Sequence, residues 1–240
     1  MKVALFGLIE KDKSKETLVK KTAKKYGLEI TRKDPEVGIC TKGDGTILYA
    51  EEKFPTLPKL TLRSKNHVGY KCTYDISRID ELFSKISQKK YTLKKHIKIK
   101  CIFNDKEINA LNEFQIHNIV TTKALRFSIN VKQKNKILFD EKNIIGDGCI
   151  FSTPFGSSAY FSSVGGKTFE KGLGLALNNP YNMDKKAFYF DEDVVFEFIL
   201  NRSPAYLLHD NNPKTITIKE NQKITLMKSE EYFNEIHINA

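Results

Sequence analysis

Residues 37–46 read VGICTKGDGT, a short apolar segment that runs directly into a loop with two glycines. The apolar part, 37–41, predicts a buried strand, and a helix-like segment, 47–53, follows the loop. Glycines at such a junction let the backbone approach a ligand closely, and free N–H groups at a helix start favour phosphate. Asp44 would then lie at the carboxyl end of a strand, where ligands of α/β proteins usually bind. The alternative interpretation is an ordinary Asp-Gly turn.

Strands and helices alternate through the first third of the chain. Apolar residues at helical spacing predict helices at 14–26 and 77–87, and in the second of these Ser77 and Asp80 resemble a capping box. This alternation predicts a mostly parallel sheet. The strands are expected at 2–8, 28–31, 37–41 and 57–62.

The second half of the chain changes to a period of two, which is typical of antiparallel strands. Apolar and polar residues alternate around 125–131, 216–218 and 224–226, and 157–164 is the one clear helix candidate in this half. We therefore predict three segments: an α/β domain at 1–88, a β-rich domain at 89–227, and a C-terminal segment, 228–240, that could return to the first domain.

Length and composition limit the class of protein. With 240 residues, 40% of them hydrophobic and 29% charged, the chain is long enough for a substantial core and is not a disordered chain. It has no apolar segment long enough to span a membrane, and its apolar start is too short for a signal peptide, so a cytoplasmic protein without a membrane partner is expected. The four cysteines lie far apart and form no C-x-x-C motif, which argues against a zinc site or a disulfide framework.

The formal net charge is +11, from 40 basic and 29 acidic residues. Such an excess is compatible with an anionic partner such as a nucleotide, a polyphosphate or a nucleic acid. The lysines occur in scattered pairs rather than in an arginine-rich stripe, which favours a solvated lysine-rich surface and argues against the reading of bases. A nucleic acid partner is therefore not expected.

Residues 110–117, ALNEFQIH, place an amide beside a carboxylate within a strand-like segment. The adjacent side chains of Asn112 and Glu113 can together bind the two hydroxyls of a ribose. A solvated strand edge or a turn is the alternative, and for this pair alone it is the better interpretation.

Residues 147–166, DGCIFSTPFGSSAYFSSVGG, form the longest pattern. A strand at 148–151 ends in a Pro-x-Gly turn that brings small hydroxyl residues to a helix start, where they leave room for a flat ring and can hydrogen-bond the edge of an adenine. Tyr160 could pack on a ring or a ribose. The alternative is a strand–turn–helix with Ser157 as N-cap, which explains one serine but not the density of Ser, Thr and Gly.

These three patterns, in this order and with a β-rich second half, resemble the NAD kinase family. That family has a GGDGT loop, an Asn–acidic pair in an L-N-E setting, and D-G-x-x-x-S-T-P-x-G-S-x-A-Y followed by two glycines. The third pattern is the specific one, and residues 66–70, NHVGY, are similar to the G-x-L-G-F segment of the family. Lipid kinases and phosphofructokinases share the GGDG element but lack the long third pattern. The resemblance covers residues 3–226.

The resemblance implies both a fold and a reaction. The fold would combine an N-terminal Rossmann-like (phosphofructokinase-like) α/β domain with a C-terminal β-sandwich-like domain, and NAD would bind in the cleft between them. The reaction would transfer the terminal phosphoryl group of ATP or polyphosphate, with Mg²⁺ or another divalent cation, to the 2′-hydroxyl of NAD, which gives NADP. A homodimer or homotetramer is also implied.

Carried over position by position, the resemblance implies one catalytic residue, Asp44, as the general base. No metal-ligating residue is predicted. The phosphate loop would consist of Lys42, Gly43, Gly45 and Thr46. The NAD-binding residues would be Gly45, Tyr70, Asn112, Glu113, Asp147, Thr153, Ser158, Ala159, Tyr160, Ser163 and Asp210.

The chain departs from the family pattern at several positions. Lys42 replaces the first glycine of the GGDGT loop, which would cost conformational freedom but adds a positive charge near the phosphates. Phe155 replaces a small polar residue and would reshape the adenine pocket, while Asn66 replaces a glycine and Asn211 follows Asp210 where a glycine is common. These departures leave two alternatives open: a non-catalytic NAD(H)-binding sensor, and a lipid or sugar kinase that shares the GDG loop.

Overall fold

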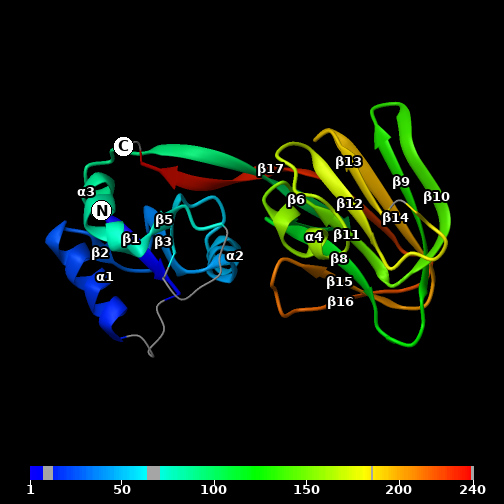
Figure 1. Cartoon of the computed structure of the whole chain (residues 1–240), viewed down its shortest axis with the longest axis horizontal. Coiled ribbons are helices and arrows are strands. Elements are labelled where there is room, and N and C mark those ends of the chain that lie inside the picture. Colours follow the sequence, from blue (N-terminus) through cyan, green and yellow to red (C-terminus); the bar gives the residue numbers. More distant parts are fainter. Residues whose placement is uncertain (8–12, 64–70, 185, 239–240) are drawn as a thin grey trace. The chain divides into compact units, whose positions relative to one another are not determined.

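The computed structural model describes residues 1–7, 13–63, 71–184 and 186–238, and the chain divides into two compact units (Figure 1). Unit 1 consists of Met1–His96 and Tyr232–Ala240, and unit 2 of Ile97–Glu231. The divisions fall within two long strands, β6 (Thr92–Phe103) and β17 (Lys223–His237), which each contribute one end to unit 1 and the other to unit 2. Both predicted domain boundaries lie a few residues before these points.

Unit 1 is built on a parallel sheet with the strand order β2-β1-β3-β4. β5 pairs in parallel with β4, and the end of β17 reaches the same strand where Glu235 pairs with Lys59. In Figure 1, α1 and α3 lie on one side of this sheet and α2 on the other, so the predicted α/β domain with a mostly parallel sheet is confirmed. The elements are β1 (Lys2–Phe6), α1 (Lys13–Lys25), β2 (Glu29–Ile30), β3 (Val37–Lys42), α2 (Asp44–Lys53), β4 (Lys59–Arg63), β5 (Tyr74–Asp75), the short 3₁₀ helix η1 (Ile76–Arg78) and α3 (Ile79–Ser87).

Helix α3 follows the predicted apolar pattern but begins differently. Its apolar residues are buried against the sheet. The predicted capping box was wrong, because Asp75 rather than Ser77 caps this segment and accepts the N–H of Ser77 at 2.8 Å. Asp80 instead accepts hydrogen bonds from Lys25 Nζ at 2.6 Å and Tyr26 Oη at 2.7 Å on α1, so its carboxylate joins two helices.

The C-terminal strand is fastened to unit 1 through a buried carboxylate, Glu235. Its Oε1 accepts hydrogen bonds from the hydroxyls of Thr61 at 3.0 Å and Thr73 at 2.5 Å. Its Oε2 lies 2.9 Å from His96 Nε2 and 3.2 Å from His237 Nε2. Burial alone would raise the pKa of Glu235, but the hydrogen bonds from His96 and Thr73 outweigh it and lower this pKa to about 2. Glu235 is therefore an anion that holds β17 beside β4 at neutral pH.

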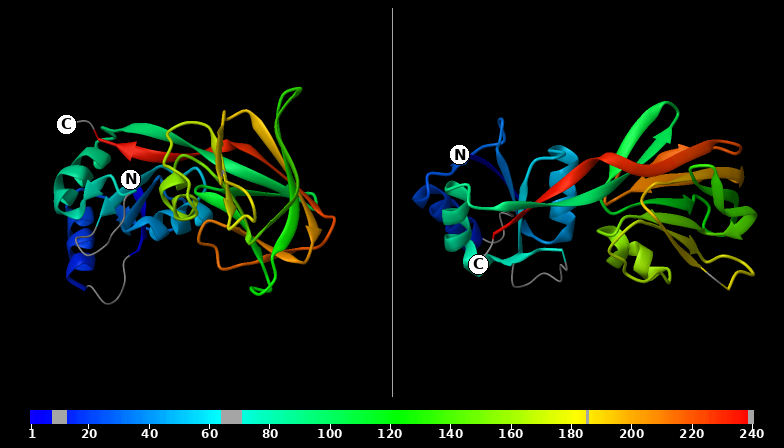
Figure 2. Two further views of the ribbon diagram at one scale, coloured as in Figure 1. Left: turned by 45° about the vertical axis from the view of Figure 1, so that its right-hand side comes forward. Right: turned by 90° about the horizontal axis from the view of Figure 1, so that it is seen from above.

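Unit 2 is a sandwich of two antiparallel sheets (Figure 2). One sheet has the order β10-β9-β14-β17, with β6 pairing both β17 and β7, and the other has the order β13-β12-β11-β8-β15-β16. Apolar residues of both sheets share one core, in which the rings of Phe151 and Phe196 meet edge to face at 5.2 Å. The prediction of a β-rich second domain is confirmed. Its further strands are β7 (Lys106–Ala110), β8 (Glu113–Asn118), β9 (Leu125–Gln133), β10 (Lys136–Gly146), β11 (Gly148–Ser152), β12 (Leu173–Asn178), β13 (Ala187–Phe190), β14 (Val194–Arg202), β15 (Ala205–His209) and β16 (Ile216–Ile218).

The predicted helix at 157–164 is interrupted. A 3₁₀ turn, η2 (Gly156–Ser158), is followed by a short helix, α4 (Tyr160–Ser163). The backbone of Ala159 between them is not helical (φ −93°, ψ −127°), which stops one continuous helix from forming. Ser157 is not an N-cap, because its hydroxyl donates to the carbonyl of Pro154 at 2.7 Å. Within the parts of the chain that the structure describes, no helix has both the length and the apolar character to cross a membrane.

Candidate active site

Asp44 is the first residue of α2 and stands directly after the loop that ends β3. Five consecutive residues of β3 are buried because helices cover both faces of the sheet. The helix begins at Asp44, earlier than the predicted start at residue 47, so the carboxylate lies in the first turn, at the positive end of the helix dipole. Its Oδ1 accepts the backbone N–H of Lys71 at 3.1 Å. An acidic group is thus held at the carboxyl end of a parallel strand.

The backbone of Lys42 has the conformation that glycine favours. Its φ is +122°, whereas Gly43, the next residue, has an extended backbone (φ 177°) that any residue adopts. The glycine requirement of this loop therefore lies at position 42, where this chain has a lysine. A side chain at such a φ strains the backbone by about 1–3 kcal/mol.

We expect Lys42→Gly to raise the free energy of unfolding by about 1 kcal/mol, because the relief of strain exceeds the ~0.5–1 kcal/mol entropic cost of a glycine. Urea denaturation followed by circular dichroism measures this change. Lys42→Ala is the matched control, since it removes the amine but keeps Cβ. Equal stabilisation by both substitutions would show that the lysine head group, and not the backbone, is the source of the effect.

Gly7 is a residue of this loop region that the sequence patterns did not single out. It follows β1 with φ +83°, and a Cβ at this position would lie 2.0 Å from the carbonyl oxygen of Thr41 and 2.8 Å from Cγ2 of Thr46. Any side chain would therefore displace β3 or the first turn of α2. A glycine at the end of the first strand of a parallel sheet was the available signal.

A second group of predicted residues lies in unit 2 and is organised by Asp210. Its Oδ1 accepts the backbone N–H groups of Asn112 at 2.7 Å and Glu113 at 3.3 Å, and its Oδ2 accepts that of Leu111 at 2.9 Å. Burial raises the pKa of Asp210 to about 6, although the three amide donors favour the carboxylate. Asp210, predicted to bind NAD, thus fixes the bend that presents Asn112 and Glu113.

Asn112 and Glu113 are almost completely buried, with 8% and 3% of their surfaces exposed. Gln115 Nε2 donates to Glu113 Oε1 at 3.0 Å. Asn112 Oδ1 is buried and has no hydrogen-bond partner among the described residues. A buried amide oxygen without a partner is costly, so this atom fits a ligand that supplies a hydrogen-bond donor.

The turn of the third pattern packs directly against this bend. Thr153 is fully buried. Its hydroxyl donates to the carbonyl of Leu111 at 2.6 Å, and its backbone N–H donates to the carbonyl of Asn112 at 2.9 Å. Gly156 leaves no room for a side chain, because a Cβ there would lie 2.2 Å from the carbonyl oxygen of Asn112. Thr153 therefore braces the bend, and the buried Phe155 lies in the same turn.

Asp147 and Tyr160 lie near a histidine that the sequence patterns did not single out. The rings of Tyr160 and His117 are stacked, with centroids 5.4 Å apart and planes 6° from parallel. Asp147 Oδ2 accepts a hydrogen bond from Asn179 Nδ2 at 3.1 Å. His117 ends the 110–117 segment but was given no role there, and Asn179 lies outside the three patterns, so only the fold reveals their contacts with Tyr160 and Asp147.

The remaining predicted residues differ in how the structure places them. Ser158 is exposed in η2, and Ala159 is half-buried between η2 and α4. Ser163 is exposed at the end of α4, where its hydroxyl donates to the carbonyl of Ala159 at 3.5 Å. Tyr70 and the rest of the predicted 66–70 segment lie outside the described residues.

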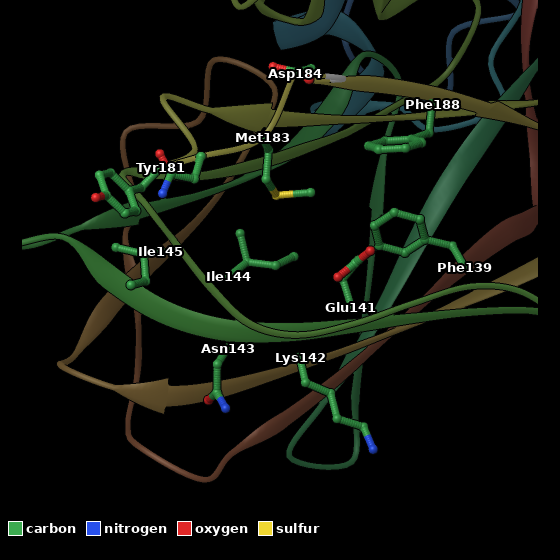
Figure 3. A pocket seen from close by; sticks show the side chains of 11 residues that line it. Phe139, Glu141, Lys142, Asn143, Ile144, Ile145, Tyr181, Met183, Asp184 and Phe188 are labelled. Carbon is green, nitrogen blue, oxygen red and sulfur yellow. The ribbon is translucent and has the colours of Figure 1, made fainter.

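Unit 2 contains a cavity of about 550 Å³ (Figure 3). Phe139 and Phe188 meet edge to face at 4.6 Å on one side of it, and Met183 points into it. No predicted site residue lines this cavity. Nor do the described residues contain a group of three or more His, Cys, Asp or Glu side chains that could hold a metal ion.

The two sets of residues have complementary chemistry. Unit 1 contributes a carboxylate at a helix start, suited to accept a proton and to stand beside phosphate-binding N–H groups. Unit 2 contributes a bend with a buried acceptor and a neighbouring carboxylate, suited to hydroxyl groups of a sugar.

Comparison with known proteins finds relatives by sequence. No family model matches the chain. The NAD kinase of Limosilactobacillus reuteri is 28% identical, and the match covers 98% of this chain and 88% of the relative. The NAD kinase of Clostridium perfringens is 24% identical over 82% of this chain and 73% of the relative.

Two solved structures share the whole fold. The structure of yeast NADH kinase complexed with NADH matches with a TM-score of 0.83 at 14% identity, and it covers 100% of this chain and 84% of that chain. The structure of an NAD kinase from Archaeoglobus fulgidus in complex with ATP matches with a TM-score of 0.79 at 19% identity, and it covers 100% of this chain and 94% of that chain. At these identities the two structures establish the fold.

Proposed function

Because this chain belongs to the NAD kinase family, we propose that it transfers the terminal phosphoryl group of ATP, or of polyphosphate, to the 2′-hydroxyl of the adenosine ribose of NAD. The product is NADP. The observation that carries this proposal is the position of Asp44 in the first turn of α2, at the end of the buried strand β3.

Asp44 would act as the general base. Phosphoryl transfer needs positioning and neutralisation of charge more than covalent help from the protein. In this reaction the bond from the terminal phosphorus to its bridging oxygen breaks, the 2′-oxygen bonds to that phosphorus, and the hydroxyl proton passes to the Asp44 carboxylate. The hydrogen bond from the N–H of Lys71 to Oδ1 would orient the carboxylate.

The loop around Asp44 would bind the phosphate donor. Gly43, Gly45 and Thr46 stand at the start of α2, where the partial positive charge of the helix dipole favours an anion. Lys42 would add a full positive charge at the cost of the strained backbone described above. Mg²⁺, or another divalent cation, would arrive with the donor phosphates and neutralise part of their charge.

The bend of unit 2 would bind NAD. Asn112 Oδ1 lacks a donor among the described residues, and a ribose hydroxyl or an amide of NAD would supply one. Glu113 would accept a second hydroxyl, while Asp210 and Thr153 hold the bend in shape. Further contacts to NAD would come from Gly45, Tyr70, Asp147, Ser158, Ala159, Tyr160 and Ser163.

A cytoplasmic location and a homodimer or homotetramer belong to the same proposal. Both rest on the resemblance to the family and on the sequence. Size-exclusion chromatography with light scattering would measure the oligomeric state of the purified chain.

A coupled assay tests the proposed function. The purified chain is incubated with Mg²⁺, NAD and either ATP or polyphosphate, and NADP is detected with an NADP-specific dehydrogenase; parallel reactions replace NAD by NADH. We expect NADP to form with at least one donor. Saturable NAD binding without formation of NADP would identify a sensor. Phosphorylation of a sugar or lipid alcohol without NAD binding would identify another kinase. Either result would overturn the proposal.

A further inference from the structure

His117 and Tyr160 form a parallel stack within unit 2. The ring centroids are 5.4 Å apart and the planes differ by only 6°. His117 lies on β8, four positions after Glu113, and Tyr160 is the first residue of α4. Aromatic rings in this arrangement attract each other beyond what their buried area provides.

The pairing of two strands places this histidine close to Asp147. His117 pairs with Gly148 across the antiparallel strands β8 and β11. Gly148 has φ +138°, and a Cβ there would lie 1.7 Å from the carbonyl oxygen of Ile116. Only a glycine lets the two strands meet at this point, so the place of the imidazole beside residues 147–148 is fixed by the main chain.

Burial of the stack favours the neutral form of the imidazole. Burial lowers the pKa of His117, and the nearby carboxylate of Asp147 opposes this shift only in part. Burial likewise raises the pKa of the Tyr160 phenol, with a smaller contribution from Asp147 in the same direction. Two uncharged rings therefore stack, and Asp147, held by Asn179, stands beside both.

Tyr160 needs such a support, because it begins a helix of only four residues and is itself half-buried. The phenol also hydrogen-bonds the side chain of Asn178, and the ring packs against the buried cluster of Ile150, Phe161 and Ala176. The imidazole stacks on one face of the ring and adds a further restraint.

We propose that His117 is a positioning residue that holds the Tyr160 ring in place for the dinucleotide. This inference rests on the proposed function and extends it to a residue to which the resemblance assigns no role. His117 acts through Tyr160 and touches no reacting atom. Its loss should therefore weaken NAD binding about three- to tenfold, as expected for one aromatic contact, and leave the chemical step unchanged.

The test compares wild type, His117→Ala, His117→Phe and Tyr160→Leu. Isothermal titration with NAD gives the Kd, and the coupled assay gives KM for NAD, KM for the donor and kcat. We expect His117→Ala to raise the Kd and the KM for NAD about three- to tenfold, while kcat and the KM for the donor stay within about twofold of wild type. His117→Phe keeps a flat ring, so it should restore the Kd and the KM for NAD. Tyr160→Leu should match or exceed the effect of His117→Ala, and His117→Ala should add little to Tyr160→Leu. His237→Ala, which removes an imidazole from unit 1, is the control for loss of a histidine as such.

The titration separates this inference from the proposed function. If wild type binds NAD but forms no NADP, the proposed function fails while the Kd series still tests the stack. An unchanged Kd in His117→Ala, a loss that His117→Phe does not restore, or a fall in kcat alone would each overturn the positioning role. Absence of NAD binding by wild type would overturn both.

Discussion

Replacing Asp44 by asparagine is expected to lower kcat by at least about a hundredfold, because a positioned general base typically contributes ~10²–10⁴-fold. Asparagine has nearly the same shape and can still accept the N–H of Lys71, so the loop should keep its geometry. It cannot accept a proton from the 2′-hydroxyl. The Kd for NAD should stay within about twofold, since the contact with the hydroxyl is retained while proton transfer is lost. The coupled assay and titration with NAD measure the two quantities.

Asp34→Asn is the matched control, since Asp34 is exposed in unit 1 and its φ of +49° is one that asparagine tolerates. It should leave kcat unchanged. Turnover like that of wild type in Asp44→Asn would remove Asp44 from the role of base. A loss of NAD binding as large as the loss of kcat would instead assign Asp44 to substrate binding.

Removing the carboxylate of Asp210 is expected to have the second large effect. In Asp210→Ala the buried N–H groups of Leu111, Asn112 and Glu113 lose their acceptor. Leaving a buried donor without a partner costs about 1–3 kcal/mol for each group, so we expect the free energy of unfolding to fall by about 3–5 kcal/mol after partial relaxation. The Kd for NAD should rise at least about tenfold, because the bend that presents Asn112 would lose its shape.

Asp210→Asn separates these hydrogen bonds from the backbone requirement. Asp210 has φ +46°, which asparagine adopts more readily than alanine. The amide keeps one acceptor oxygen, so asparagine should lose roughly half as much stability as alanine. Urea denaturation of the three proteins measures the series. A loss below about 1 kcal/mol in Asp210→Ala would contradict the role of this carboxylate as the organiser of the bend.

The local features of the fold followed from the sequence. The largely apolar residues 37–41 of β3 and the apolar face of α3 predicted buried elements, and the alternation in β9 predicted an antiparallel strand. The start of α2 was predicted too late because Gly43 and Gly45 are poor helix formers, and a helix that begins with such residues is stabilised by its packing.

Contacts between distant residues could not be predicted in the same way. Asp210 binds N–H groups about a hundred positions earlier in the chain, and His117 meets Tyr160 only because β8 pairs with β11. Neither contact leaves a periodic signal in the sequence. Lys42 could be predicted only in part. The motif marked it as a departure from the family pattern, but only its φ of +122° shows that the backbone at this position favours glycine.

In the proposed reaction the Asp44 carboxylate faces the 2′-hydroxyl of the adenosine ribose. A crystal structure of Asp44→Asn with bound NAD measures this directly, because the slow variant keeps the substrate intact. We expect the residue-44 side-chain oxygen to lie within hydrogen-bond reach of the 2′-oxygen, about 2.6–3.2 Å. A side chain that instead faces the nicotinamide or the pyrophosphate, with the 2′-oxygen beyond reach even through one water, would contradict it.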